Sequence, residues 1–134
     1  MSDKITIDSN ILIYAFANVQ DYRKEVSKRI ISTCHIISIQ AVNETANVLL
    51  RKFNLPKEQL EGIVNFFIEQ FIITSLSTST LLKTNDIFKR YDFSFWDSMM
   101  IAAALNNHCN IIYTEDLTHN QVIDNKLQII NPFL

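Results

Sequence analysis

The sequence is poor in three features that define large protein classes: glycine, cysteine and long hydrophobic runs. One glycine, Gly62, stands among 134 residues. P-loops and dinucleotide-binding fingerprints each need several glycines, so this chain contains neither motif. Two cysteines are too few for a disulfide framework, which favours a reducing compartment. Any phosphate chemistry must therefore depend on side chains, and carboxylates that hold a metal ion are the first candidates.

The longest apolar runs span residues 11–17 and 99–105, seven residues each. A transmembrane helix needs about 20 apolar residues, so we expect no membrane span. The first four residues lead directly into Ile5 and Ile7 without the apolar region of a signal peptide. Together these observations predict a cytoplasmic protein.

The composition indicates one folded domain over residues 1–134. Domains cluster at about 100–150 residues, and a hydrophobic content of 48% is ample for a buried core. We find no repeat, linker or low-complexity tract that divides the chain. The formal charge of −2 argues against general nucleic-acid binding through a basic surface.

Short β-branched runs alternate with longer segments of helical periodicity. This alternation is typical of βαβ units and predicts an α/β protein with a parallel sheet flanked by helices. We expect strands at residues 5–7, 36–38, 71–74, 111–113 and 127–130. The expected helices span residues 9–16, 23–33, 41–52, 57–70, 79–91 and 95–107, the last two capped by Thr78 and Ser94. Asparagine replaces glycine at the turns, because it tolerates the left-handed conformation; we expect this at Asn54, Asn110 and Asn125.

Four carboxylates fall at the ends of these elements. Asp8 follows the first strand, and Asp116 lies just past the fourth. Glu44 lies one turn into the helix after the second strand, and Asp97 is in the first turn of its helix. The carboxyl ends of parallel strands meet at one edge of the sheet, where sites form. Carboxylates gathered there repel each other unless a cation is bound, and Mg²⁺ or Mn²⁺ prefers such oxygen ligands and activates water for attack on phosphodiesters.

Each acid also has a purely structural explanation. Asp8 and Asp116 would cap a helix or a turn. Asp97, three residues after Ser94, fits a capping box, and Glu44 would be a solvated helix residue. The pattern of the residues alone does not choose between these explanations and a metal site.

At these positions the sequence resembles the PIN-domain nucleases, and among them the VapC-type toxins of toxin–antitoxin pairs. The similar segments follow the family order over the whole chain. They are residues 6–15 (TIDSNILIYA), Asn43-Glu44 in its amphipathic helix, residues 95–104 (FWDSMMIAAA), and residues 113–117 (YTEDL) with His119, Gln121 and residues 131–133 (NPF).

The resemblance implies a three-layer α/β/α sandwich with a mostly parallel sheet and an endoribonuclease activity that depends on Mg²⁺ or Mn²⁺. It implies an RNA substrate, a cognate antitoxin, a homodimer and, as a toxin, inhibition of translation. The catalytic, metal-binding acids that it implies are Asp8, Glu44, Asp97 and Asp116. Asn10 and Thr114 match polar positions beside the first and fourth acids and would orient ligands or water. Asp116 is preferred over the adjacent Glu115 because Thr-x-Asp matches the family spacing.

Without the four proposed ligands, the formal charge of the remaining chain changes from −2 to +2. Basic residues that would contact backbone phosphates lie on two expected helices: Arg23, Lys24, Lys28 and Arg29, then Arg51 and Lys52. Solvated helix faces are the alternative explanation for these residues.

Two further features favour structural roles. Cys34-His35 and His108-Cys109 fit no usual zinc spacing, so buried cysteines are the better prediction. Phe66, Phe67 and Ile68 are consecutive, so they cover more of the helix than one core-facing stripe. Either that helix is buried on two sides or it presents a partner surface.

A second functional class stays open: a non-catalytic RNA-binding or protein-interaction module on the same fold. A degenerate copy would be expected to lose an acid, and this chain has all four. A haloacid-dehalogenase phosphatase is disfavoured, because Asn10 stands where its second aspartate would be needed.

Overall fold

The computed structural model describes residues 3–34 and 36–134. Within them the helices are α1 (Ser9–Phe16), α2 (Tyr22–Thr33), α3 (Ile39–Arg51), α4 (Lys57–Gln70), α5 (Thr78–Arg90) and α6 (Phe95–Asn106). The strands are β1 (Ile5–Ile7), β2 (Ile36–Ser38), β3 (Ile72–Thr74), β4 (Ile111–Tyr113), β5 (Val122–Ile123) and β6 (Leu127–Ile130). The expected elements are present with shifts of one or two residues at their ends, and β5 is additional.

The strands form one sheet in the order β3-β2-β1-β4-β6-β5. All neighbouring pairs are parallel except β5 and β6, which are antiparallel. The chain moves outward from β1 through β2 to β3 and then returns to place β4 on the other side of β1, so the order reverses between β1 and β4. This reversal is where doubly wound sheets form their sites.

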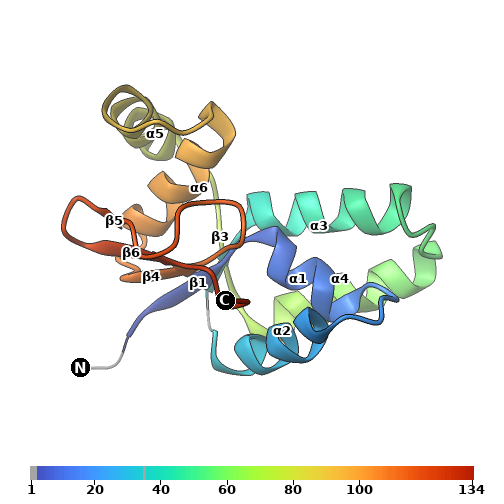
Figure 1. Cartoon of the computed structure of the whole chain (residues 1–134). Helices are drawn as coiled ribbons and strands as arrows, with labels where there is room; N and C mark the ends of the chain where they lie inside the picture. Colours follow the sequence, from blue (N-terminus) through green and yellow to red (C-terminus); the bar gives the residue numbers. More distant parts are fainter. Residues whose placement is uncertain (1–2, 35) are drawn as a thin grey trace.

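Helices cover both faces of the sheet, which confirms the predicted α/β/α sandwich (Figure 1). On one face, Ile7 and Ile37 pack in a core with residues of α1, α2, α3 and α4. On the other face, Ile112 and its register partner Ile129 pack against α5 and α6. Side chains of successive strand residues point to opposite faces of the sheet. Because helices cover both faces, the strands carry apolar side chains on both of them.

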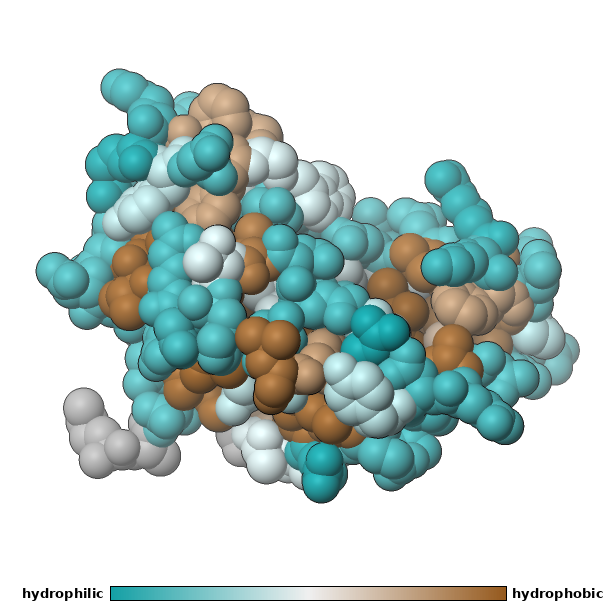
Figure 2. All heavy atoms as spheres, in the orientation of Figure 1, coloured by the Kyte–Doolittle hydropathy of each residue, from teal (hydrophilic) through white to brown (hydrophobic). Residues whose placement is uncertain are grey.

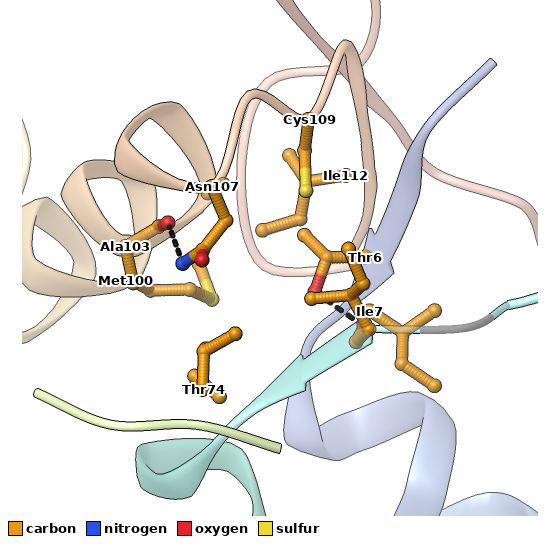
Figure 3. Close-up of a pocket in the computed structure, with 11 residues that line it drawn as sticks. Thr6, Ile7, Thr74, Met100, Ala103, Asn107, Cys109 and Ile112 are labelled. Carbon is orange, nitrogen blue, oxygen red and sulfur yellow. Dashed lines mark hydrogen bonds between the residues drawn. The ribbon is translucent and has the colours of Figure 1, made fainter. Parts of the chain in front are cut away.

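A small cavity of about 10 Å³ lies between β1, β2, β3 and α6 (Figure 3). Thr6, Met100 and Asn107 are among the residues that line it. Two of the polar groups there already have partners: Thr6 Oγ1 donates to Ile36 O at 2.9 Å, and Asn107 Nδ2 donates to Ala103 O at 2.8 Å. A space of this size holds about one water molecule, so it is no substrate site.

Two local features differ from the sequence predictions. The N-cap of α5 is Ser77, and Thr78 is the first helical residue. Ser77 is the N-cap because its hydroxyl accepts a hydrogen bond from Thr80 N while the Thr80 hydroxyl accepts one from Ser77 N. This reciprocal pair is a capping box. Strand β5 was not predicted, since two residues carry no periodicity; it is created by a tight turn in which Asp124 and Asn125 are both left-handed, with φ of 54° and 55°.

Asparagine takes left-handed turn positions at Asn54, Asn120 and Asn125, with φ of 51°, 70° and 55°. Asn54 and Asn125 were predicted, whereas the prediction for Asn110 was wrong. His108 is the left-handed residue in that turn, with φ of 60°. The Asn110 side chain accepts a hydrogen bond from Lys4 N at 2.7 Å, so it ties the turn to the start of β1.

Hydrophilic residues cover most of the face drawn in Figure 2, and hydrophobic residues reach it in separate groups. On α4, Phe67 is buried in the core, but Ile68 is 60% exposed and Phe66 is 37% exposed. Burial on two sides is therefore wrong for this helix in the single chain, and a partner surface there stays a prediction. Both cysteines are buried and free, as expected. Among the described residues, no helix has the length and apolar character needed to cross a membrane.

Candidate functional site

Asp8 lies at the point where β1 ends and α1 begins. Its backbone is extended and its Oδ1 accepts a hydrogen bond from Ser9 N at 2.7 Å, so it serves as the N-cap of α1. Its own N–H donates to Tyr113 O at 3.0 Å and continues the β1–β4 ladder. The structural explanation for Asp8 is therefore correct, but this cap uses one carboxylate oxygen. Asp8 is only 7% exposed.

The second oxygen of Asp8 joins a polar group that includes Asp116. Asp8 Oδ2 accepts from Thr114 Oγ1 at 2.9 Å and from Asn10 Nδ2 at 3.2 Å. Asn10 Nδ2 also donates to Asp116 Oδ2 at 3.0 Å, and Asp116 N donates to Thr114 Oγ1 at 3.2 Å. Asn10 and Thr114 thus lie between the first and fourth acids, the two carboxylates beside which they were predicted to act.

Glu44 approaches the same place from α3. Its Oε1 accepts from Ser9 Oγ at 2.7 Å, and Ser9 Oγ lies 3.4 Å from Asp8 Oδ1. Its Oε2 accepts from Trp96 Nε1 at 2.7 Å. Glu44 therefore does not project freely into solvent: both of its oxygens are held, one by each neighbouring helix.

Asp97 lies in the first turn of α6. The Ser94 hydroxyl accepts from Asp97 N at 3.0 Å, so the predicted cap is present and uses the backbone of Asp97. Asp97 is half-buried, as is Glu44, whereas Asp116 is exposed. The four acids therefore extend from a buried residue, Asp8, to the protein surface.

Burial and mutual repulsion both act on the charges of these acids. Burial raises the pKa of Asp8 from 3.8 to about 6, opposed by its hydrogen bonds with Thr114 and Ser9 and assisted by repulsion from Glu44 and Asp116. The pKa of Asp97 is also raised, first by burial and then by repulsion from Asp116 and Glu44. Asp8 and Asp97, whose pKa values are raised, are thus both repelled by the charges of Glu44 and Asp116. A bound cation would relieve this repulsion.

The donor set has the chemistry of a hard-cation site but is not closed around one point. Within residues 3–34 and 36–134, no three acidic, histidine or cysteine side chains lie close enough to hold one ion as they stand. Some carboxylates would have to turn toward one another on binding. In favour of a fit, Asn10 Oδ1 is buried without a hydrogen-bond partner in this part of the chain. Oxygen ligands of this kind suit Mg²⁺ and Mn²⁺.

A family model for the PIN domain matches residues 5–124, a stretch that contains all four acids. The chain belongs to the PIN-domain family. A comparison with curated proteins gave no match.

Several solved structures are similar in fold to this PIN domain. One is Mycobacterium tuberculosis VapC20, described as a sarcin-ricin loop cleaving toxin: identity is 16%, the TM-score is 0.67, and 84% of this chain and 91% of that chain are covered. Another is DNA-bound VapBC from Salmonella typhimurium, with 19% identity, a TM-score of 0.67 and coverage of 96% and 97%. A third is FitAcB from Neisseria gonorrhoeae, with 13% identity, a TM-score of 0.65 and coverage of 96% and 98%. At these identities the likeness concerns the fold.

In this PIN domain Glu115 and Asp116 point to different partners. Glu115 accepts hydrogen bonds from Tyr14 Oη and from Arg23 Nη1, the latter at 3.2 Å. The Arg23 guanidinium also lies 4.7 Å from the centroid of the Tyr14 ring. Glu115 is thereby tied to α1 and α2, while Asp116 is tied to Asn10 and Thr114.

Sequence reasoning missed two side chains of this PIN domain site, Ser9 and Trp96. Both stand beside predicted acids in the chain, Ser9 after Asp8 and Trp96 before Asp97. Adjacency to an acid was the available signal, but it did not reveal that both would donate to Glu44, which lies 35 and 52 residues away in the sequence.

Proposed function

We propose that this PIN domain is a divalent-metal-dependent endoribonuclease and the toxin of a toxin–antitoxin pair. The observation that carries the proposal is the chain of contacts in which Asn10 and Thr114 join Asp8 to Asp116, and Ser9 joins Asp8 to Glu44. Capping alone does not explain why carboxylates from four segments of the chain lie at the strand-order reversal. Metal-assisted hydrolysis of a phosphodiester uses such a group.

The residues that would hold Mg²⁺ or Mn²⁺ are Asp8, Glu44, Asp97 and Asp116. When bound, such an ion supplies positive charge that stabilises the phosphate oxygens, and it lowers the pKa of a water molecule bound to it. The chain itself supplies the positioning. Thr114 and Asn10 hold Asp8 Oδ2, and Ser9 and Trp96 hold the two oxygens of Glu44. Asn10 Oδ1, buried and without a partner among the described residues, is an acceptor that would take a hydrogen bond from a bound water.

We propose RNA as the substrate, a cognate antitoxin as the partner, and a homodimer as the assembly. VapC20, similar in fold, is described as cleaving the sarcin-ricin loop. The Salmonella neighbour is a VapBC complex bound to DNA, and a Klebsiella pneumoniae neighbour is a toxin–antitoxin complex. Cleavage of an RNA needed for protein synthesis would inhibit translation.

The test is RNA cleavage by the purified full chain with Mg²⁺, with Mn²⁺ and with EDTA. We expect cleavage that depends on the metal and is lost in Asp97→Asn, whose folded state is checked by circular dichroism. Asp92→Asn removes one exposed aspartate outside the group and should leave cleavage unchanged. A wild type that binds RNA without cutting it would favour the non-catalytic module. Asp97→Asn that cuts as fast as the wild type would refute the proposed acidic site.

A further inference from the structure

Beside the four acids, an open hollow of about 400 Å³ lies between α3 and α6. We name it the Trp96 hollow; its walls include Ile39, Gln40, Val42, Leu76, Trp96 and Met99. Three of these side chains are large and apolar yet exposed: Ile39 at 44%, Leu76 at 36% and Trp96 at 49%. A volume of this order and an apolar lining are typical of small-molecule sites.

Trp96 belongs both to the hollow and to the acidic site. Its Nε1 donates to Glu44 Oε2 at 2.7 Å, while its indole lines the hollow. An occupant of the hollow would therefore lie next to Glu44. Trp96 therefore connects a ligand in the hollow to the substrate of the acidic site.

Gln40 gives the hollow a hydrogen-bonding requirement. The residue is only 5% exposed, and its Nε2 donates to Trp96 O at 3.2 Å. Its Oε1 is buried, and no group in residues 3–34 or 36–134 donates to it. A buried acceptor without a donor is unfavourable, so a ligand that brings an N–H group would be stabilised here.

We propose that the Trp96 hollow takes one unpaired nucleobase of the RNA, stacked on the Trp96 indole and donating an N–H to Gln40 Oε1. This inference rests on the proposed ribonuclease function and names how its substrate is held. Nucleobases have a flat π-face for stacking, and each has an N–H donor on its pairing edge. A phosphate does not fit inside the hollow itself, because the described residues that line the hollow include no lysine or arginine to pair with the charge. An aliphatic side chain of a protein would fill the space but leave Gln40 Oε1 without a donor.

Holding one base at Trp96 would fix the position of the adjoining backbone phosphate. Because Trp96 contacts Glu44 directly, that phosphate would lie near the acids. The hollow would also require a single-stranded or extruded nucleotide, since a base inside a duplex offers neither face nor pairing edge.

Trp96 is the single tryptophan of the chain, so intrinsic fluorescence reports on this position alone. The full chain, kept in EDTA to leave RNA intact, is titrated with a short single-stranded RNA. The matched probe is the same oligonucleotide with abasic riboses, which has equal charge but no bases. We expect quenching by the RNA and none by the abasic strand. Equal responses to both strands overturn the proposal, as does an unchanged signal while anisotropy of labelled RNA shows binding.

Kinetic variants provide a second test. Trp96→Ala is expected to raise KM for RNA about tenfold or more, the range for loss of one stacked base, in addition to the fall in kcat that follows from freeing Glu44 Oε2. Gln40→Leu should raise KM with the fold retained, and Phe88→Ala, which removes another exposed ring, should leave KM unchanged. Unchanged KM in both hollow variants contradicts the proposal.

The outcomes separate this proposal from the ribonuclease function. Quenching by RNA without any cleavage in Mg²⁺ would refute the ribonuclease and retain the base site. Cleavage without quenching would do the reverse. A fluorescence change that follows protein concentration and ignores RNA would assign the hollow to a second copy of the chain and overturn the proposal.

Discussion

Ser9 Oγ donates a hydrogen bond of 2.7 Å to Glu44 Oε1 and so connects the first turn of α1 to α3. Ser9 also donates its N–H to Asp8. Ser9 therefore contacts two acids that come from different segments of the chain. Of these two acids, only Asp8 directly follows a strand that fixes its position. The carboxylate of Glu44 depends on its hydrogen bonds with Ser9 and Trp96.

The first prediction concerns that tie. Ser9→Ala leaves the backbone cap of α1 but frees Glu44 Oε1, so kcat for RNA cleavage should fall about 10–100-fold, as for other groups that orient ligands. The free energy of unfolding should fall by about 1 kcal/mol, the usual value of one hydrogen bond. Ser32→Ala, which removes an exposed serine hydroxyl in α2, is the control and should change neither quantity. Wild-type kcat in Ser9→Ala would mean that Glu44 needs no such support.

The second prediction concerns the two adjacent acids. Asp116→Asn should abolish most cleavage, because Asp116 is the one joined to Asn10 and Thr114. Glu115→Gln should retain most activity, since Glu115 is occupied by Tyr14 and Arg23. Initial rates at saturating RNA compare the two variants with the wild type. Greater loss in Glu115→Gln than in Asp116→Asn would transfer the fourth position to Glu115.

The third prediction concerns metal binding and stability. A ligand at about ten times its Kd stabilises the native state by about 1.4 kcal/mol, which for a chain of this length raises Tm by about 4–6 °C. We expect such a rise with Mg²⁺ in the wild type and little or none in Asp8→Ala. Differential scanning fluorimetry with and without Mg²⁺ measures it, with Asp92→Asn as the control. The same rise in Asp8→Ala and the wild type would place the ion elsewhere.

The fourth prediction concerns pH in the absence of metal. The pKa of Asp8 is raised to about 6 in the folded chain, so between the ordinary value and about 6 the folded state binds more protons than the unfolded state. The free energy of unfolding should therefore fall as pH rises from about 4 to about 6, by an amount of the order of 2 kcal/mol. Asp97 contributes in the same direction.

Urea unfolding in EDTA at a series of pH values measures this dependence. Asp8→Asn keeps a neutral side chain at every pH, so its stability should fall less over the same range than that of the wild type. Identical pH profiles for the two proteins would show that the pKa of Asp8 is not raised in the folded state.

The positions of the acids were predictable because they follow from topology. Parallel strands bring their carboxyl ends to one edge, so the βαβ pattern placed Asp8 and Asp116 at the same edge, while the pairing of β1 with β4 that brings them together was not predicted. Asp97 and Glu44 followed from helix starts at that same edge. The predicted sheet needed no side-chain geometry.

The contacts of those acids were not predictable from local patterns. Glu115 and Asp116 are adjacent in the sequence and chemically alike, and only Arg23 and Tyr14, far away in the chain, distinguish them. Likewise, the bond from Trp96 to Glu44 depends on how α6 and α3 pack. Strand β5 and the Ser77 cap depend on single turns, where one residue changes the outcome.

The hydrogen bond from Thr114 to Asp8 spans 106 residues of sequence. A ribosome that has synthesised Asp8, Glu44 and Asp97 has still not produced the strand that pairs with β1 or the hydroxyl that holds Asp8. The acidic group is therefore complete only after residues 114–116 have been synthesised. Until β4 has been synthesised and has paired with β1, any activity that needs the complete acidic group is absent.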